Sequence, residues 1–257
     1  MMGWGEAALL LIAGLAAGMV NAIAGGGSLI TFPSMLAIGM PPVAANVSNA
    51  LSVAPGYASS VVGSRADLAG QGRRVLRVLP TALFGALCGC VLLLNTPRRV
   101  FDFVVPFLVI GAALTLAFQA KLRGLVGHPQ EVSPKRATVM LHTAVFLCAL
   151  YGGYFNAALG VLLVAGLALV LDETLARVSA LKNLLSALVG VVTILVYSAF
   201  GPVNWAAVAV IAPATVVGGY LGARVARKLP ANILRAVIVT FGITVGAYLF
   251  VRATTGR

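Results

Sequence analysis

The hydrophobic positions of the chain form runs of about 20 residues, separated by short polar connections. A helical run of that length crosses the ~30 Å hydrocarbon core of a bilayer. The pattern predicts an all-α, polytopic integral membrane protein with long spans at about 6–23, 44–63, 76–95, 101–120, 137–156, 177–198, 206–226 and 233–252. Two shorter apolar pieces, 28–39 and 159–171, are short for a perpendicular crossing and are expected to be half-helices or tilted arms.

Polar and glycine positions recur along the chain, which indicates an internal duplication. Asn21 and the glycines after it are echoed by Asn156 and Gly160, and Asn49 is echoed by Asn183. These asparagine pairs are 135 (156 − 21) and 134 (183 − 49) residues apart. Repeats with interrupted helices in corresponding positions point to the binding site of a transporter. The predicted organisation is two transmembrane repeats of about five helical segments each, joined by a cytoplasmic linker: 1–120, 137–257 and 121–136.

Composition excludes an ordinary soluble domain. The chain is 60% hydrophobic and only 9% charged, with a mean hydropathy of +1.03, whereas a soluble domain has about 25% charged residues. The first apolar stretch has no basic n-region and contains Glu6, so we expect a retained helix and not a signal peptide. The formal net charge of +12 is explained by basic cytoplasmic loops, and no nucleic-acid partner is predicted.

The distribution of basic residues predicts the orientation. One arrangement has the chain cross the membrane at each of the two short pieces, with Lys182 inside a span. Four of the other basic residues then fall on one side of the membrane, namely Arg98, Arg99, Arg252 and Arg257. The remaining 13 of the 18 Lys and Arg residues fall on the other side, whereas a plain eight-span arrangement gives 10 against 7. The positive-inside rule therefore favours two inverted repeats with both termini periplasmic, in a bacterial plasma (inner) membrane.

Two polar constellations are candidates for binding. Gly25–Gly27 would break the helix and point the N-terminus of 28–39, with Ser28 as its cap, toward a buried site that suits an anion. Asn49, Ser52 and Gly56 share one helical face, and Asn183, Ser186 and Gly190 repeat that spacing. Close helix packing at the glycines and interhelical hydrogen bonding by the amides are the alternative explanations. The predicted substrate-binding residues are Asn21, Gly25, Gly26, Gly27, Ser28, Asn46, Asn49, Ser52, Asn156, Lys182, Asn183 and Ser186.

Charged residues near the predicted spans add one further candidate. Lys182 lies about one and a half turns inside 177–198, where it would either snorkel to the interface or attract an anion. Asp172 and Glu173 lie in a short loop and are expected to be solvated. The sequence shows no catalytic triad, phosphate-binding loop or metal-ligand spacing, so neither an enzyme nor a cofactor or metal is predicted.

These residues resemble the signatures of the sulfite exporter TauE/SafE family, also called toluenesulfonate uptake permeases. The first signature is similar to 18–33 (GMVNAIAGGGSLITFP) with 39–46 (GMPPVAAN), and the second to 151–155 (YGGYF) with 180–186 (ALKNLLS). The resemblance implies a membrane carrier with inverted repeats that moves sulfite or organosulfonates, usually outward and without ATP hydrolysis. After Phe155 many relatives are richer in glycine than Asn156–Gly160 of this chain.

The residues and the resemblance agree on an anion as the substrate. We predict a secondary transporter that exports sulfite or a small organosulfonate across the plasma membrane by alternating access. The alternatives are a carrier for another small anion such as a carboxylate, an anion channel on the same scaffold, and an assembly or sensing protein without transport. The expected partners are the anionic substrate and the lipid bilayer, and glycines on lipid-facing helices are compatible with a homodimer.

Overall fold

The fold was obtained as a computed structural model, which describes residues 3–23, 25–118, 133–168 and 170–225, with 236, 239–240, 243–247 and 249–251. These residues form helices and connections, without strands. Most of the predicted linker and nine of the 20 residues of the predicted span 233–252 lie outside the described residues. The elements are α1 (Trp4–Ile23), α2 (Ser28–Ala37), α3 (Pro42–Gly63), η1 (Arg65–Leu68), α4 (Gly72–Asn95), α5 (Arg98–Ala117), α7 (Pro134–Tyr154), α8 (Leu159–Ala168), α9 (Leu175–Phe200) and α10 (Trp205–Val225).

The prediction of an all-helical, polytopic membrane protein is confirmed. Five described helices, α1, α4, α5, α7 and α9, are long and apolar enough to cross a membrane. Both short pieces are separate helices of 10 residues, α2 and α8. The start of α4, predicted at 76 and observed at Gly72, is the largest shift among the described helix starts. The α3 and α7 helices each begin at a proline. Proline favours this position because the first N–H of a helix has no intrahelical partner in any case.

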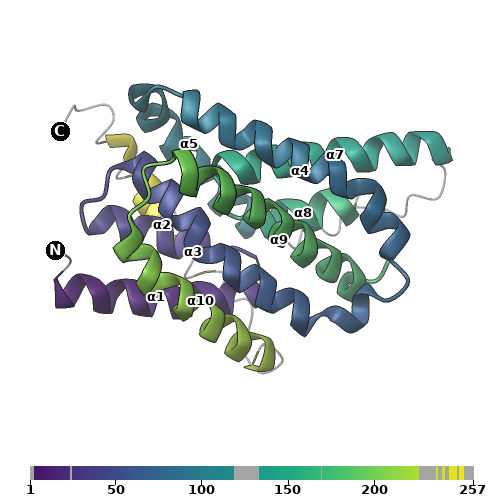
Figure 1. The fold of residues 1–257 in the computed structure, drawn as a ribbon, viewed down its shortest axis with the longest axis horizontal. Coiled ribbons are helices and arrows are strands. Elements are labelled where there is room, and N and C mark those ends of the chain that lie inside the picture. The colour runs from purple at the N-terminus through teal and green to yellow at the C-terminus, as the bar shows by residue number, and fades with distance from the viewer. Residues whose placement is uncertain are drawn as a thin grey trace.

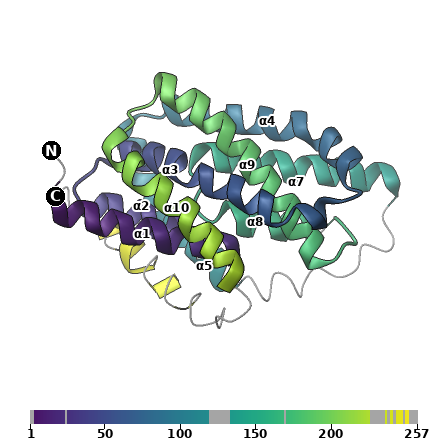
Figure 2. The same ribbon diagram turned by 60° about the horizontal axis from the view of Figure 1, so that its bottom comes forward.

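The helix contacts show which elements run in the same direction. Gly14 of α1 packs on Ile211 of α10, and Gly18 packs one turn later on Thr215, so α1 and α10 are parallel. The α4 and α7 helices are parallel by the same criterion, since Gly85 meets Phe146 and Gly89 meets Leu150. Both pairs lie side by side in Figures 1 and 2. Small residues at these crossings let the backbones approach closely.

The central helix α3 is parallel to α10 and antiparallel to α9. Thr215 of α10 donates a hydrogen bond to the Ser52 carbonyl, and Gly219 packs on Ser59 one turn further on. Along α9 the order is reversed, because Gly190 packs on Ala54 of α3 whereas the earlier Asn183 reaches the later Ser60. Since α1 and α3 both run parallel to α10, the chain returns between them through α2.

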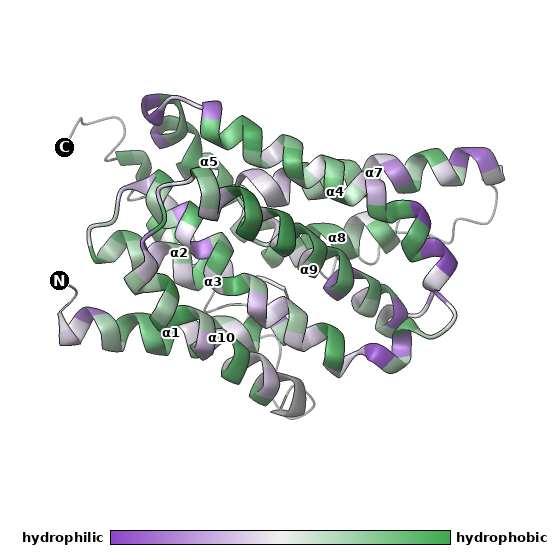
Figure 3. Ribbon diagram, viewed as in Figure 1, coloured by the Kyte–Doolittle hydropathy of each residue, from purple (hydrophilic) through white to green (hydrophobic). Residues whose placement is uncertain are grey.

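Hydrophilic residues gather at one end of the helices, where α7 begins (Figure 3). We call this the basic end and define it by Arg65, Arg73, Arg74, Arg77 and Arg177. Apolar side chains fill the space between the helices, and the rings of Phe32 in α2 and Phe155, directly after α7, meet edge to face at 5.3 Å. This contact packs the first short helix against the chain that leads into the second.

Candidate binding site at the two helix breaks

The first break, between α1 and α2, is organised by the side chain of Asn21. The Gly27 N–H donates a 2.8 Å hydrogen bond to Asn21 Oδ1. Gly25 has a φ of +84°, a left-handed conformation that glycine adopts without steric cost. Gly26 contributes its carbonyl, which accepts from the Leu29 N–H at 3.1 Å. The three glycines therefore interrupt the helix as the sequence predicts.

The prediction that Ser28 caps α2 is wrong. Ser28 is the first residue of the helix, and Gly27 occupies the cap position without any side-chain hydrogen bond. Gly27 already has helical backbone angles (φ −60°, ψ −31°), so the helix begins before the serine can take the extended conformation of a cap. The Ser28 hydroxyl therefore makes no capping hydrogen bond to α2.

The second break, between α7 and α8, reaches a similar geometry without a run of glycines. Asn156 and Ala158 have positive φ values of 63° and 55°. Asparagine tolerates this region, whereas alanine is strained there by about 1–2 kcal/mol. The Tyr151 hydroxyl donates a 2.8 Å hydrogen bond to the Ala157 carbonyl and supports the turn.

The two breaks meet in the interior. A Cβ atom placed on Gly25 would lie 2.9 Å from the Cα atom of Gly160, so the two backbones are in direct contact. A Cβ atom placed on Gly160 would lie 3.1 Å from Cδ of Lys182. The lysine is only 5% exposed, so its stem packs against the breaks and does not extend over the surface. The structure thus brings together three residues that the sequence predicted separately.

Two residues outside the predicted set donate hydrogen bonds to asparagines within it. Thr31 of α2 donates a hydrogen bond to Asn49 Oδ1, and the Tyr57 hydroxyl donates to Asn156 Oδ1 at 3.2 Å. Tyr57 is also next to the Ser28 hydroxyl, although no hydrogen bond of good geometry forms there. Thr31 is part of the first family-like segment and Tyr57 follows Asn49 on α3. Their positions in the sequence did not show which asparagine each of them bonds to.

Three of the predicted binding residues use a polar group in a hydrogen bond within the protein. Asn46 donates from Nδ2 to the Tyr154 carbonyl at 2.8 Å and joins α3 to α7. Asn183 donates from Nδ2 to Ser64 Oγ at 3.1 Å and lies toward the basic end. Ser52 donates to the Ser48 carbonyl of its own helix. Interhelical hydrogen bonding, the alternative to binding, therefore accounts for the amide nitrogens of Asn46 and Asn183.

Seven of the predicted residues keep a buried polar atom without a partner. All nine polar residues of the predicted set are buried, with no more than 7% exposure. Among the described residues nothing bonds to the following atoms: Asn21 Nδ2, Ser28 Oγ, Asn46 Oδ1, Asn49 Nδ2, Asn156 Nδ2, Asn183 Oδ1 and Ser186 Oγ. Three amide NH₂ groups and two hydroxyls are donors, which can hold the oxygen atoms of an anion. Two carbonyl oxygens remain as acceptors.

The left-handed backbone at Asn156 leads to a prediction about stability. We expect the Asn156→Gly variant to be more stable than Asn156→Ala by about 1 kcal/mol, because only alanine is strained at φ 63°. Both variants remove the amide, so the difference reports the backbone alone. Thermal unfolding in a neutral detergent measures it. Equal unfolding temperatures would contradict a left-handed residue at this position.

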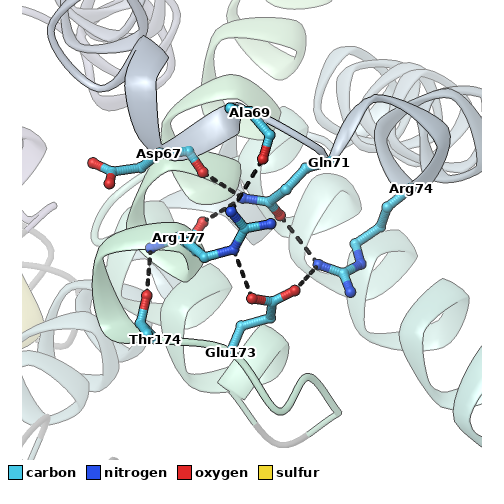
Figure 4. A network of polar contacts seen from close by, with 7 residues as sticks. All are labelled: Asp67, Ala69, Gln71, Arg74, Glu173, Thr174 and Arg177. Carbon is cyan, nitrogen blue, oxygen red and sulfur yellow. Dashed lines mark hydrogen bonds and ion pairs between the residues drawn. The ribbon is translucent and has the colours of Figure 1, made fainter.

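Glu173, predicted to be solvated, keeps partial exposure but is also paired with two arginines. Glu173 accepts from Arg74 of α4 at 2.9 Å and from Arg177 of α9 at 2.7 Å (Figure 4). Hydrogen bonds from Arg74 and then Arg177 hold the pKa of the Glu173 carboxyl below its usual range. The sequence could not show this, because Arg74 is 99 residues away. The Arg74–Glu173 ion pair joins the two halves of the chain at the basic end, and the Glu173–Arg177 pair lies within the second half.

Comparison with known proteins identifies similar sequences. The family model described as "Sulfite exporter TauE/SafE" matches residues 10–249. "Probable membrane transporter protein ORF9" of Sinorhizobium sp is 29% identical over 251 residues, which cover 96% of this chain and 93% of the relative. "Probable membrane transporter protein YfcA" of Escherichia coli (strain K12) is 26% identical over 245 residues, covering 94% and 88%. A "Probable membrane transporter protein" of Haemophilus influenzae is 25% identical over 235 residues, covering 90% and 89%. No solved structure matches the chain.

Proposed function

The chain belongs to the sulfite exporter TauE/SafE family, and on that premise we propose that it exports sulfite or a small organosulfonate anion. The protein is a membrane transporter. The proposal adds the substrate, the direction and the mechanism, which is alternating access in a bacterial plasma membrane. It also adds that the binding site is formed by the polar residues around the two helix breaks.

The observation that carries the proposal is that five buried donor groups of the predicted set have no hydrogen-bond partner among the described residues. Leaving such an atom unsatisfied costs about 1–3 kcal/mol. Several such atoms among the predicted substrate-binding residues therefore need an explanation. A bound anion supplies acceptors to the NH₂ groups of Asn21, Asn49 and Asn156 and to the hydroxyls of Ser28 and Ser186. Water would satisfy these atoms when the substrate has left.

Lys182 is proposed to supply the positive charge of the site. Its side chain is buried and packs against Gly160, which itself contacts Gly25. An ammonium group in this position favours an anion over a neutral or cationic substrate. This burial argues against the alternative in which Lys182 snorkels to the membrane interface.

The packing of the helices supports two inverted repeats. The repeat equivalents of α1 and α10 are α7 and α4, and the two resulting pairs, α1 with α10 and α7 with α4, have the same parallel crossing through small residues. The equivalents α3 and α9 cross antiparallel, as a two-fold axis in the membrane plane requires. We therefore place the basic end in the cytoplasm and both termini in the periplasm.

The burial of the site supports alternating access as the mechanism. Its polar residues are closed off from solvent in the described conformation, so a substrate enters or leaves only if one repeat moves relative to the other. A carrier of this kind shows saturable counterflow of labelled sulfite in proteoliposomes, and this is the experiment that tests the function. An anion channel would instead give non-saturating flux, and a carboxylate carrier would exchange carboxylates and not sulfite.

The donor role of Asn49 leads to a prediction about affinity. We expect Asn49→Ala to raise the half-saturating sulfite concentration for counterflow by roughly tenfold, because a hydrogen bond to a charged group contributes about 1.5–3 kcal/mol. The matched control is Asn95→Ala at the exposed end of α4, where the amide donates to the Val91 carbonyl of its own helix. Unchanged affinity in folded Asn49→Ala protein would remove Asn49 from the site.

A further inference from the structure

A cleft at the basic end has a strong excess of positive charge. It has a volume of about 340 Å³ and is lined by Arg73, Arg74 and Arg77 of α4, His142 of α7, and Glu173 and Arg177 at the start of α9. Four guanidinium groups face one carboxylate, so the formal excess is three positive charges with His142 neutral. Arginines gathered at the N-terminal end of a helix are also disfavoured by the helix dipole. An anionic ligand would compensate this charge.

The arginines of this cleft divide into two kinds. Arg74 and Arg177 both donate to Glu173 (Figure 4). A second hydrogen bond fixes each side chain, from Arg74 to Gln71 Oε1 and from Arg177 to the Ala69 carbonyl. In contrast, Arg73 and Arg77 are exposed and make no hydrogen bond or ion pair with the described part of the chain. They stand four residues apart, on one face of α4. The fixed pair shapes the cleft, and the other pair is available to a ligand.

Exposed apolar residues are next in sequence to residues that line the cleft. Leu76, between the two available arginines in sequence, is 70% exposed, and Val139 on α7 is 64% exposed. In a membrane protein, exposed apolar side chains near a helix end face the acyl chains. The helix ends around the cleft thus carry both exposed guanidinium groups and exposed apolar side chains. A lipid matches this arrangement better than a free ion does.

We propose that this cleft binds the phosphate group of an anionic phospholipid, with Arg73 and Arg77 as its principal donors. Guanidinium groups bind phosphate oxygens in a bidentate manner, and basic pockets between transmembrane helices suit acidic head groups. The site is separate from the helix breaks, and the lipid would bridge α4 and α7, which belong to different halves of the chain.

The test is a lipid titration of the full-length protein in a neutral detergent. We expect phosphatidylglycerol to raise the unfolding temperature clearly more than phosphatidylcholine does. In an Arg73→Gln/Arg77→Gln variant the apparent dissociation constant for phosphatidylglycerol should rise by roughly tenfold or more. The control is Arg98→Gln/Arg99→Gln, which removes two exposed arginines from the start of α5, at the opposite end.

Three results would overturn the proposal. One is an equal response to both lipids in the parent protein. Another is an equal loss, or no loss, in the two double variants. In a separate arm, inorganic phosphate is added without lipid, and stabilisation equal to that by phosphatidylglycerol would show a phosphate site without a lipid preference. Native mass spectrometry on the same samples counts the bound lipids and separates binding from any change in folding.

Discussion

Replacing Lys182 by glutamine is expected to weaken sulfite binding more than the loss of any other single polar side chain in the site. The side chain is buried against the two breaks, where no bulk water screens its attraction for an anion. A charge-assisted hydrogen bond contributes about 1.5–3 kcal/mol, so we expect the half-saturating concentration to rise by roughly ten- to a hundredfold. Counterflow of labelled sulfite in proteoliposomes measures this change.

The matched control for this experiment is Lys135→Gln. Lys135 is exposed in the first turn of α7 and carries the same charge, so the control corrects for the loss of one positive charge from the protein. Gel filtration and thermal unfolding establish that both variants are folded. Normal sulfite affinity in folded Lys182→Gln protein would contradict a role for the lysine in anion binding, and the proposed site would then have no source of charge.

The second large effect is expected from Gly25→Ala. The new methyl group would lie 2.9 Å from the Cα atom of Gly160, which is backbone and cannot rotate away. The left-handed φ of +84° adds about 1–2 kcal/mol of strain, and overpacking typically adds a further ~1–3 kcal/mol. We expect a clearly lower unfolding temperature and loss of counterflow, because the two breaks are pushed apart.

Gly39→Ala separates these two causes. Gly39 has nearly the same φ, +82°, but nothing lies within 4 Å of an added Cβ atom. This variant therefore carries the backbone strain without the clash, and we expect it to keep most of its transport. If both variants lose stability and transport equally, backbone strain alone is responsible, and contact between the two breaks is not needed for function.

Much of the fold could be predicted from the sequence because it depends on local composition. Apolar runs of 20 residues have few alternatives in a bilayer, and the described helices begin within four residues of the predicted starts. The break at Gly25–Gly27 was predictable for the same reason, since three glycines in succession oppose a helix wherever they occur. That Gly27 and not Ser28 occupies the cap position of α2 was not predictable, because it depends on the backbone angles of Gly27.

The partners of the polar side chains could not be read from their spacing. Asn49 and Asn183 are repeat equivalents with similar sequence surroundings, yet Asn49 accepts from Thr31 whereas Asn183 donates to Ser60 and Ser64 near the basic end. The difference arises because α3 and α9 cross antiparallel and each helix presents a different stretch to its neighbours. A repeat in the sequence predicts equivalent positions and not equivalent contacts.

The sequence by itself determined that the protein is a helical membrane protein of duplicated pattern, with polar residues at interrupted helices. Hydrophobicity over 20 residues and the conformational cost of glycine decide these features locally. Only the tertiary structure decided that Gly25 touches Gly160, that Lys182 packs beside them and that Glu173 joins two arginines. These contacts link residues far apart in the chain, and they depend on the angles and close approaches at which packed helices cross.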